Sequence, residues 1–214
     1  VSVDAWVTNT VAVRDAGSVS YQGFVAAERS FLDHELIARA PRQLNRAGIG
    51  DVVSIHTALE DWRCGGPYAA TWDATAAAAA AAVLADLEAA VDEVRQVSSR
   101  GIDAIATAHT TINRLCLDLG HSQMEEGSEH YLAYALEVAT GRSFVHGRLV
   151  GLGTVVTAWL QGNDPDRVVR CLDAAGVEWR PATLDLDVSV IDAVLVGLPD
   201  FVVEHGYPGV FHRW

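Results

Sequence analysis

The chain has 214 residues, of which half are hydrophobic and a fifth are charged, so it can bury a sizeable core. Its formal net charge is −13, and all 15 basic residues are arginine, which excludes catalysis through a lysine Schiff base. Nucleic acids and anionic membranes need clustered positive charge, so we expect neither as a partner.

Residues 1–40 are expected to form a β-rich leader. Val11-Ala-Val13 and Val19-Ser-Tyr21 alternate about the turn Asp15-Ala-Gly17-Ser18, which predicts a β-hairpin. Asp33 is suited to cap a short helix that ends near Ala40, because Pro41 follows it. A segment of this size cannot form a core alone, so it must rest on the remainder of the protein.

Residues 41–214 are expected to form one helical domain, which makes the fold class mainly α, a helical bundle with a short N-terminal β-hairpin. Apolar residues recur with a period near 3.6, and glycine or proline follows most of the periodic stretches. The expected helices are residues 45–63, 73–98, 101–119, 125–140, 146–160 and 164–175, with weaker helices at 187–196 and 199–204.

Three local patterns carry residues suited to bind a metal. Ala47-Gly-Ile-Gly-Asp51 places a carboxylate after a glycine-rich turn, and Glu125-Glu-Gly-Ser-Glu-His130 places a histidine in the first turns of a helix. In Phe144-Val-His146-Gly the glycine lets another backbone approach closely. Two imidazoles and one carboxylate form a three-ligand set typical of catalytic zinc or ferrous iron. Spacing alone does not separate this set from unrelated histidine pairs.

Longer stretches around these residues resemble the glycerol-1-phosphate dehydrogenases. They are Asn45-Arg-Ala-Gly-Ile-Gly-Asp51, Gly127-Ser-Glu-His130 and His146-Gly-Arg-Leu-Val-Gly-Leu-Gly153. That family is grouped with glycerol dehydrogenases, iron-containing alcohol dehydrogenases and dehydroquinate synthases. The resemblance implies a dehydroquinate synthase-like C-terminal helical domain. It also implies that Asp51, His130 and His146 bind one divalent metal, either zinc or iron.

The resemblance continues at the N-terminus. Val3-Asp-Ala-Trp-Val-Thr8 is similar to the segment that follows the nicotinamide-binding loop of the family. It implies that Asp4 contacts substrate and that Thr8 contacts the nicotinamide cofactor. Residues 1–40 would then be a remnant of the junction with a nucleotide-binding domain.

Three further residues are candidates for substrate chemistry. Tyr134 stands where the family has a second histidine that faces the substrate, so the match does not extend to the identity of the substrate. Its i,i+4 spacing places Tyr134 on the same helix face as His130, which makes it a catalytic candidate. His121 is a second catalytic candidate, because it lies in the loop that closes over substrate in the family. Arg148 is a candidate for binding an anionic substrate.

Three hypotheses for function remain open. The sequence has no G-x-G-x-x-G before residue 40, so NAD(P) is expected only with a partner domain. In the first hypothesis the chain is the metal and substrate half of a dehydrogenase acting on a small hydroxy compound, phosphorylated or not. In the second it is a freestanding redox-neutral lyase, isomerase or hydrolase on a hydroxy-carbonyl substrate. In the third it is a non-catalytic remnant that binds a partner.

The first hypothesis is favoured, because the chain begins with Val1 and its single methionine is Met124, as expected of a trimmed polypeptide. A separate nucleotide-binding subunit is then an expected partner. A half-enzyme also exposes the face that its other half would cover, so we expect a homo-oligomer. Three irregularly spaced cysteines, the absence of a signal peptide and the absence of a long apolar run predict a cytoplasmic location without membrane association.

Overall fold

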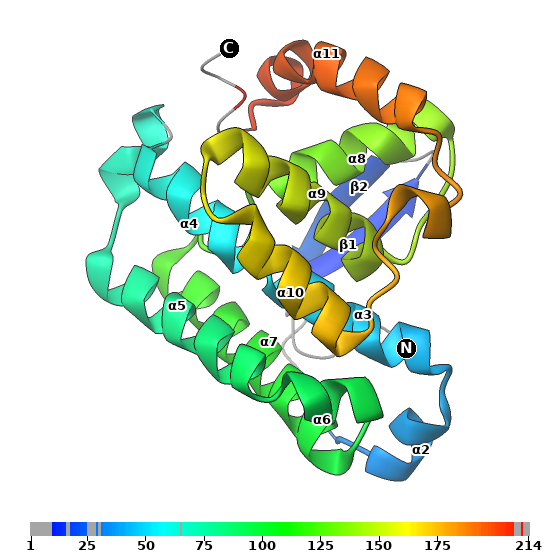
Figure 1. Ribbon diagram of the computed structural model, residues 1–214. Coiled ribbons are helices and arrows are strands. Elements are labelled where there is room, and N and C mark those ends of the chain that lie inside the picture. Colours follow the sequence, from blue (N-terminus) through cyan, green and yellow to red (C-terminus); the bar gives the residue numbers. More distant parts are fainter. Residues whose placement is uncertain are drawn as a thin grey trace.

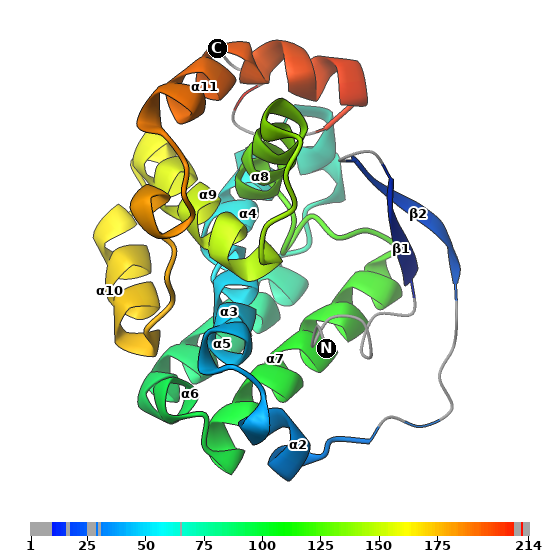
Figure 2. The same cartoon turned by 90° about the vertical axis from the view of Figure 1, so that its right-hand side faces the viewer.

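The computed structural model describes residues 10–15, 18–24, 29, 31–64, 66–207 and 211 (Figure 1). Within the first forty residues, strands β1 (Thr10–Asp15) and β2 (Ser18–Phe24) pair antiparallel. Their register is irregular near Thr10. Figure 2 shows this pair standing to one side of the helices.

The remainder of the described chain is helical, which confirms the predicted mainly α fold. The α-helices are α2 (His34–Arg39), α3 (Arg42–Val52), α4 (Ile55–Cys64), α5 (Ala74–Ala89), α6 (Val91–Gln96), α7 (Ser99–Leu119), α8 (Ser128–Thr140), α9 (His146–Gln161), α10 (Pro165–Ala175) and α11 (Val188–His205). Two short 3-10 helices, η1 (Gly66–Thr71) and η2 (Pro181–Thr183), lie in the connections. The predicted division into residues 1–40 and 41–214 stays a prediction.

Local sequence explains most of the helix ends. Four helices begin at an aspartate whose side chain accepts hydrogen bonds from backbone N–H groups of the first turn, and these are Asp33, Asp73, Asp164 and Asp187. Five helices end at a glycine in the left-handed region, namely Gly120, Gly141, Gly162, Gly176 and Gly206. The helix boundaries predicted from the same residues are therefore close to those observed.

Four predicted helices were wrong in their extent. Residues 45–63 form two helices, because the chain turns at Val53 and Ser54, where Ser54 Oγ donates to the Asp51 carbonyl. Residues 73–98 also form two helices, which divide at Ala90. Conversely, α11 runs unbroken through Pro199, because Leu198 and Val202 are buried on the side that packs against α8.

Helix α9 is the centre of the bundle. It contacts α8, α3, α10 and α4, and α11 covers α8 from the other side (Figure 1). Helices α5 and α7 pack against each other below this group. The buried face of α9 is built largely from small residues, which lets its neighbours approach the helix backbone.

Two of these close approaches depend on glycine. A Cβ on Gly147 of α9 would collide with the carbonyl of Ala47 in α3, and a Cβ on Gly50 of α3 would collide with the carbonyl of Gly147. A Cβ on Gly153 would likewise collide with the carbonyl of Glu129 in α8. Helices α3 and α8 are therefore held against α9 by backbone contact, and the residues beside these glycines are brought together.

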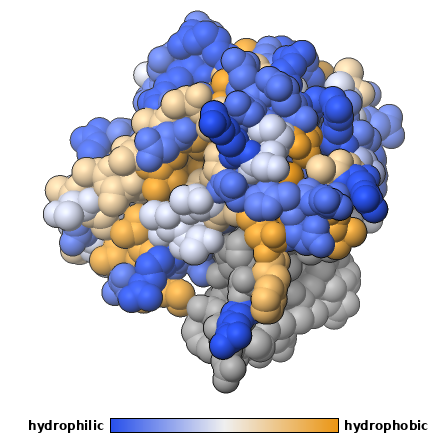
Figure 3. All heavy atoms as spheres, turned by 90° about the horizontal axis from the view of Figure 1, so that it is seen from below, coloured by the Kyte–Doolittle hydropathy of each residue, from blue (hydrophilic) through white to orange (hydrophobic). Residues whose placement is uncertain are grey.

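The surface of the described part mixes polar and apolar side chains. Figure 3 shows one such face, seen from below, where hydrophobic residues gather on the left and hydrophilic ones are more frequent at the top and right. No helix among the described residues has both the length and the apolar character needed to cross a membrane.

We expect Gly147→Ala to lower the free energy of unfolding by roughly 1–3 kcal/mol, because the added methyl group forces α3 and α9 apart. Gly197→Ala is the matched control, since it lies in α11 and a methyl group added there would meet no other part of the described chain within 4 Å. That control should be neutral or stabilising by up to about 1 kcal/mol, because alanine favours the helix. Urea unfolding measures both variants, and a Gly147→Ala protein as stable as wild type would contradict the backbone contact.

Candidate metal centre

Asp51 brings the carboxylate of the site into the bundle. It lies in the last turn of α3, directly after Gly50, where α3 touches α9. Its Oδ1 is 3.2 Å from His130 Nε2 and 3.3 Å from His146 Nε2. The side chain of Asp51 is 19% exposed, so both imidazoles approach a largely buried oxygen.

The two histidines come from the beginnings of two neighbouring helices. His130 lies in the first turn of α8 and its side chain is 7% exposed, whereas His146 is the first residue of α9 and is 38% exposed. Their ring centroids are 5.2 Å apart. The site is therefore closed on the side of α8 and more open on the side of α9.

The three donor atoms fit a single divalent metal. Ligand atoms of Asp51, His130 and His146 all lie within 4.8 Å of one another. Donors bound to one tetrahedral zinc at about 2.0–2.1 Å would lie about 3.3–3.4 Å apart. The observed separations of 3.2 and 3.3 Å from Asp51 Oδ1 are close to that value. The family resemblance implied this set of residues, and the structure brings their ligand atoms together.

The same groups influence one another's protonation. Burial alone would raise the pKa of Asp51, but the charge of His146 and hydrogen bonds from both histidines hold it well below its usual value. Burial would lower the pKa of His130, yet hydrogen bonds to Asp51 and Glu129 raise it well above its usual value. Asp51 is therefore kept as the carboxylate, which is the form that binds a metal.

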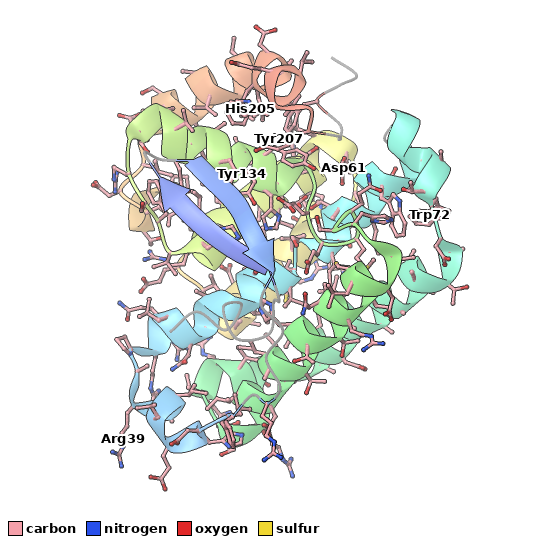
Figure 4. The ribbon with its side chains drawn as sticks, turned by 180° about the vertical axis from the view of Figure 1, so that it is seen from behind. Arg39, Asp61, Trp72, Tyr134, His205 and Tyr207 are labelled. Atoms are coloured by element: carbon pink, nitrogen blue, oxygen red, sulfur yellow. The ribbon has the colours of Figure 1, made fainter. Side chains whose placement is uncertain are left out.

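Tyr134 lies beside the three candidate ligands, as its spacing from His130 predicted. Its ring centroid is 6.1 Å from that of His130 and 6.5 Å from that of His146. Tyr134 Oη donates to Glu126 Oε1 at 2.9 Å, and Ser122 Oγ donates to Glu126 Oε2 at 2.8 Å. Figure 4 shows Tyr134 on α8 close to Tyr207, which follows α11. A catalytic role for Tyr134 stays a prediction.

Among the described residues, His121 makes no hydrogen bond or ring contact with Asp51, His130 or His146. Its ring lies edge-on to Trp62, with centroids 5.1 Å apart, and its buried Nδ1 has no hydrogen-bond partner in the described part of the chain. Burial lowers the pKa of His121, which favours the neutral imidazole. Its predicted catalytic role is not tested by this placement.

The guanidinium group of Arg148 is hydrogen-bonded to backbone carbonyls. Its Nε donates to the Glu178 carbonyl at 2.7 Å and its Nη2 donates to the Thr183 carbonyl at 2.6 Å. The Glu178 carboxylate also lies 3.3 Å from Nη2. These contacts tie α9 to the segment after α10, and substrate binding by Arg148 stays a prediction. Asp4 and Thr8, the other residues predicted to contact substrate and cofactor, lie outside the described residues.

Two acidic residues near the site were missed by sequence reasoning. Glu129 accepts a hydrogen bond from His130 Nδ1 at 3.0 Å, and Glu126 accepts the one from Tyr134. Adjacent residues of a helix point to different faces, so nothing in the pattern Ser-Glu-His indicates contact between Glu129 and His130. The fully buried carboxylate of Glu129 becomes recognisable only in the fold.

These observations define a helical domain with a candidate three-ligand metal centre. No family model matches the sequence. Curated relatives from Aeropyrum pernix and Hyperthermus butylicus are 28% and 30% identical over 173 and 167 residues. These matches cover 80% and 74% of this chain, and 49% and 46% of the relatives. A relative from Methanococcoides burtonii is 26% identical, over 91% of this chain and 55% of its own length.

Each of these relatives is named a glycerol-1-phosphate dehydrogenase using NAD(P)+. The chain is therefore homologous to the glycerol-1-phosphate dehydrogenases, as the three sequence blocks indicated. It spans about half the length of the curated relatives it matches.

The buried carboxyl group of Asp61 supplies a pH-dependent prediction. Asp61 Oδ2 accepts from the Ser128 backbone N–H at the start of α8, and burial together with Glu129 raises the pKa of Asp61 to about 7. The unfolded chain has a value near 3.9, so the folded protein binds the additional proton between about pH 4 and pH 7. Stability therefore falls as the pH rises through this window.

We expect the metal-free wild type to lose more stability between pH 5 and pH 8 than Asp61→Asn, because asparagine has no proton to release. Urea unfolding at the two pH values measures the difference. The exposed Asp86→Asn variant is the control and should keep the wild-type dependence. Equal losses in wild type and Asp61→Asn would contradict the assigned role of the buried carboxyl group.

Proposed function

We propose that this chain is the metal and substrate half of an NAD(P)-dependent dehydrogenase that acts on a small polyol or related hydroxy compound. The observation that carries the proposal is the convergence of Asp51, His130 and His146 on one point, in a chain homologous to glycerol-1-phosphate dehydrogenases. Zinc and ferrous iron both suit two imidazoles and one carboxylate. The nucleotide-binding half would be a separate subunit or another part of the natural protein.

A divalent ion held by these donors would polarise a substrate hydroxyl, lower its pKa and favour departure of the hydride to the nicotinamide. The donor atoms come from α3, α8 and α9, and α9 contacts both of the other two helices. His146 is the most exposed of the three, so substrate is expected to enter on its side.

Tyr134 would orient the substrate hydroxyl groups. Its phenol is fixed by the bond from Oη to Glu126, and its ring lies next to both histidines. Because the single phenolic proton is donated to Glu126, Oη would accept a hydrogen bond from a substrate hydroxyl. Histidine has a much lower ordinary pKa than a phenol and would act differently at this position. The substrate preference is therefore expected to differ between this protein and relatives that carry histidine at this position.

The metal site is tested by adding Zn²⁺ and measuring bound metal after dialysis. Wild type should retain about one ion per chain, whereas His130→Ala should retain none, because only two of the three donors remain. His56→Ala is the matched control, since His56 is a partly buried histidine whose Nε2 contacts the Asn163 carbonyl. Unchanged stoichiometry in His130→Ala would refute the metal site.

The dehydrogenase activity is tested on the native assembly, isolated from its own cells with any nucleotide-binding polypeptide that co-purifies. We expect reduction of NAD(P)+ with glycerol 1-phosphate or glycerol, abolished by a chelator and restored by Zn²⁺ or Fe²⁺. Intact mass of each polypeptide shows whether the nucleotide-binding half is a separate chain. A native assembly that retains its metal but neither binds nor reduces NAD(P)+ would contradict the proposal.

A further inference from the structure

Glu129 is a buried carboxylate in contact with a candidate metal ligand. Its side chain has no exposed surface. Oε1 accepts from His130 Nδ1 at 3.0 Å and from the Gly127 backbone N–H at 2.6 Å, and Oε2 accepts from Thr57 Oγ1 at 2.7 Å. The position of both carboxylate oxygens is thus fixed by hydrogen bonds from two helices.

These contacts determine which nitrogen of His130 can bind a metal. A carboxylate only accepts hydrogen bonds, so Nδ1 must carry the proton that it donates to Glu129. Nε2 faces the Asp51 carboxylate, so a metal bound between them would take the place of a proton on Nε2, while Nδ1 keeps the proton that it donates to Glu129. Nε2 is the atom that lies 3.2 Å from Asp51 Oδ1 and belongs to the candidate metal site.

Capping of α8 describes only part of what Glu129 contacts. Glu129 does accept from the N–H of Gly127, the residue that precedes α8. Asp61 and Glu137 are likewise buried and accept from backbone N–H groups near helix starts, so burial alone does not indicate a further role. Glu129 in addition accepts from Nδ1 of the candidate ligand His130, and this contact points to a second role.

Neighbouring helices contact Glu129 at its side chain and at its backbone. Thr57 Oγ1, which donates to Oε2, also lies 3.1 Å from the Ser54 carbonyl within α4. On the other side, Gly153 of α9 lies directly against the Glu129 carbonyl. Glu129 is therefore enclosed by α4, α8 and α9, the same arrangement that places His130 and His146 next to each other.

We propose that Glu129 is a positioning residue that fixes the tautomer and orientation of His130 for metal binding through Nε2. The inference rests on the proposed metal site and adds a residue outside the three ligands. Hydrogen bonds of this kind also make the imidazole a stronger donor to the metal, and their loss typically lowers metal affinity about 10–100-fold.

The test compares Glu129→Gln with Glu137→Gln by chelator competition for Zn²⁺. Glu137 is the matched control, because it is a second buried glutamate on α8, accepts from the Phe144 backbone N–H and lies seven residues beyond the candidate ligand His130. We expect Glu129→Gln to weaken Zn²⁺ binding about 10–100-fold and to alter the visible spectrum of the Co²⁺-substituted protein. Glu137→Gln should leave both readouts at the wild-type values.

A second measurement needs no variant and so does not depend on folding of Glu129→Gln. In ¹⁵N NMR of Zn²⁺-loaded wild type, His130 should be protonated at Nδ1 and bound to the metal through Nε2. Binding through Nδ1, or wild-type Zn²⁺ affinity in a folded Glu129→Gln protein, would overturn the positioning role. If His130→Ala also keeps its metal, the proposed metal site has failed, and with it the inference; if only Glu129→Gln binds normally, the metal site stands without Glu129.

Discussion

The contact between the backbones of α3 and α9 is the constraint on which the site depends. Gly50 and Gly147 face each other without side chains, and either Cβ would collide with a carbonyl of the opposite helix. Asp51 follows the first glycine and His146 precedes the second, so the contact sets the separation of their side chains directly. The third donor, His130, enters because Gly153 lets α8 approach the same helix. Small residues therefore determine how the three candidate metal ligands are placed.

Much of the fold could be predicted from the sequence, because most helix ends carry local signals such as Asp164 and Gly176. The errors occur where an end depends on distant contacts. The turn after α3 is stabilised by Ser54 Oγ, which contacts both the Asp51 carbonyl and the Glu125 carbonyl, 71 residues away. Pro199 would ordinarily interrupt a helix, yet buried neighbours hold α11 together around it. Neither effect is visible within a short window of sequence.

The candidate ligands were predictable because the sequence blocks around them resemble the glycerol-1-phosphate dehydrogenases, whereas their residue types and spacing alone left unrelated histidine pairs as an alternative. Glu129 was not, since a carboxylate beside a histidine in sequence usually points elsewhere on a helix. The contacts of Arg148 were not predictable either. Its guanidinium donates to two backbone carbonyls that lie 30 and 35 residues away in the sequence. Contacts between residues this far apart do not appear in a local sequence pattern, and the predicted role of Arg148 in substrate binding stays a prediction.

The buried acids of the site differ in charge because their neighbours differ. Asp51 lies beside two imidazoles, which hold its pKa well below the usual value despite burial. Burial and a neighbouring carboxylate raise the pKa of Asp61 to about 7 and that of Glu125 to about 8. Both are therefore largely neutral in mildly acidic solution, whereas Asp51 stays ionised beside its two histidines. Neighbouring groups rather than burial alone thus decide that the acid among the candidate ligands is the one in the form that binds a metal.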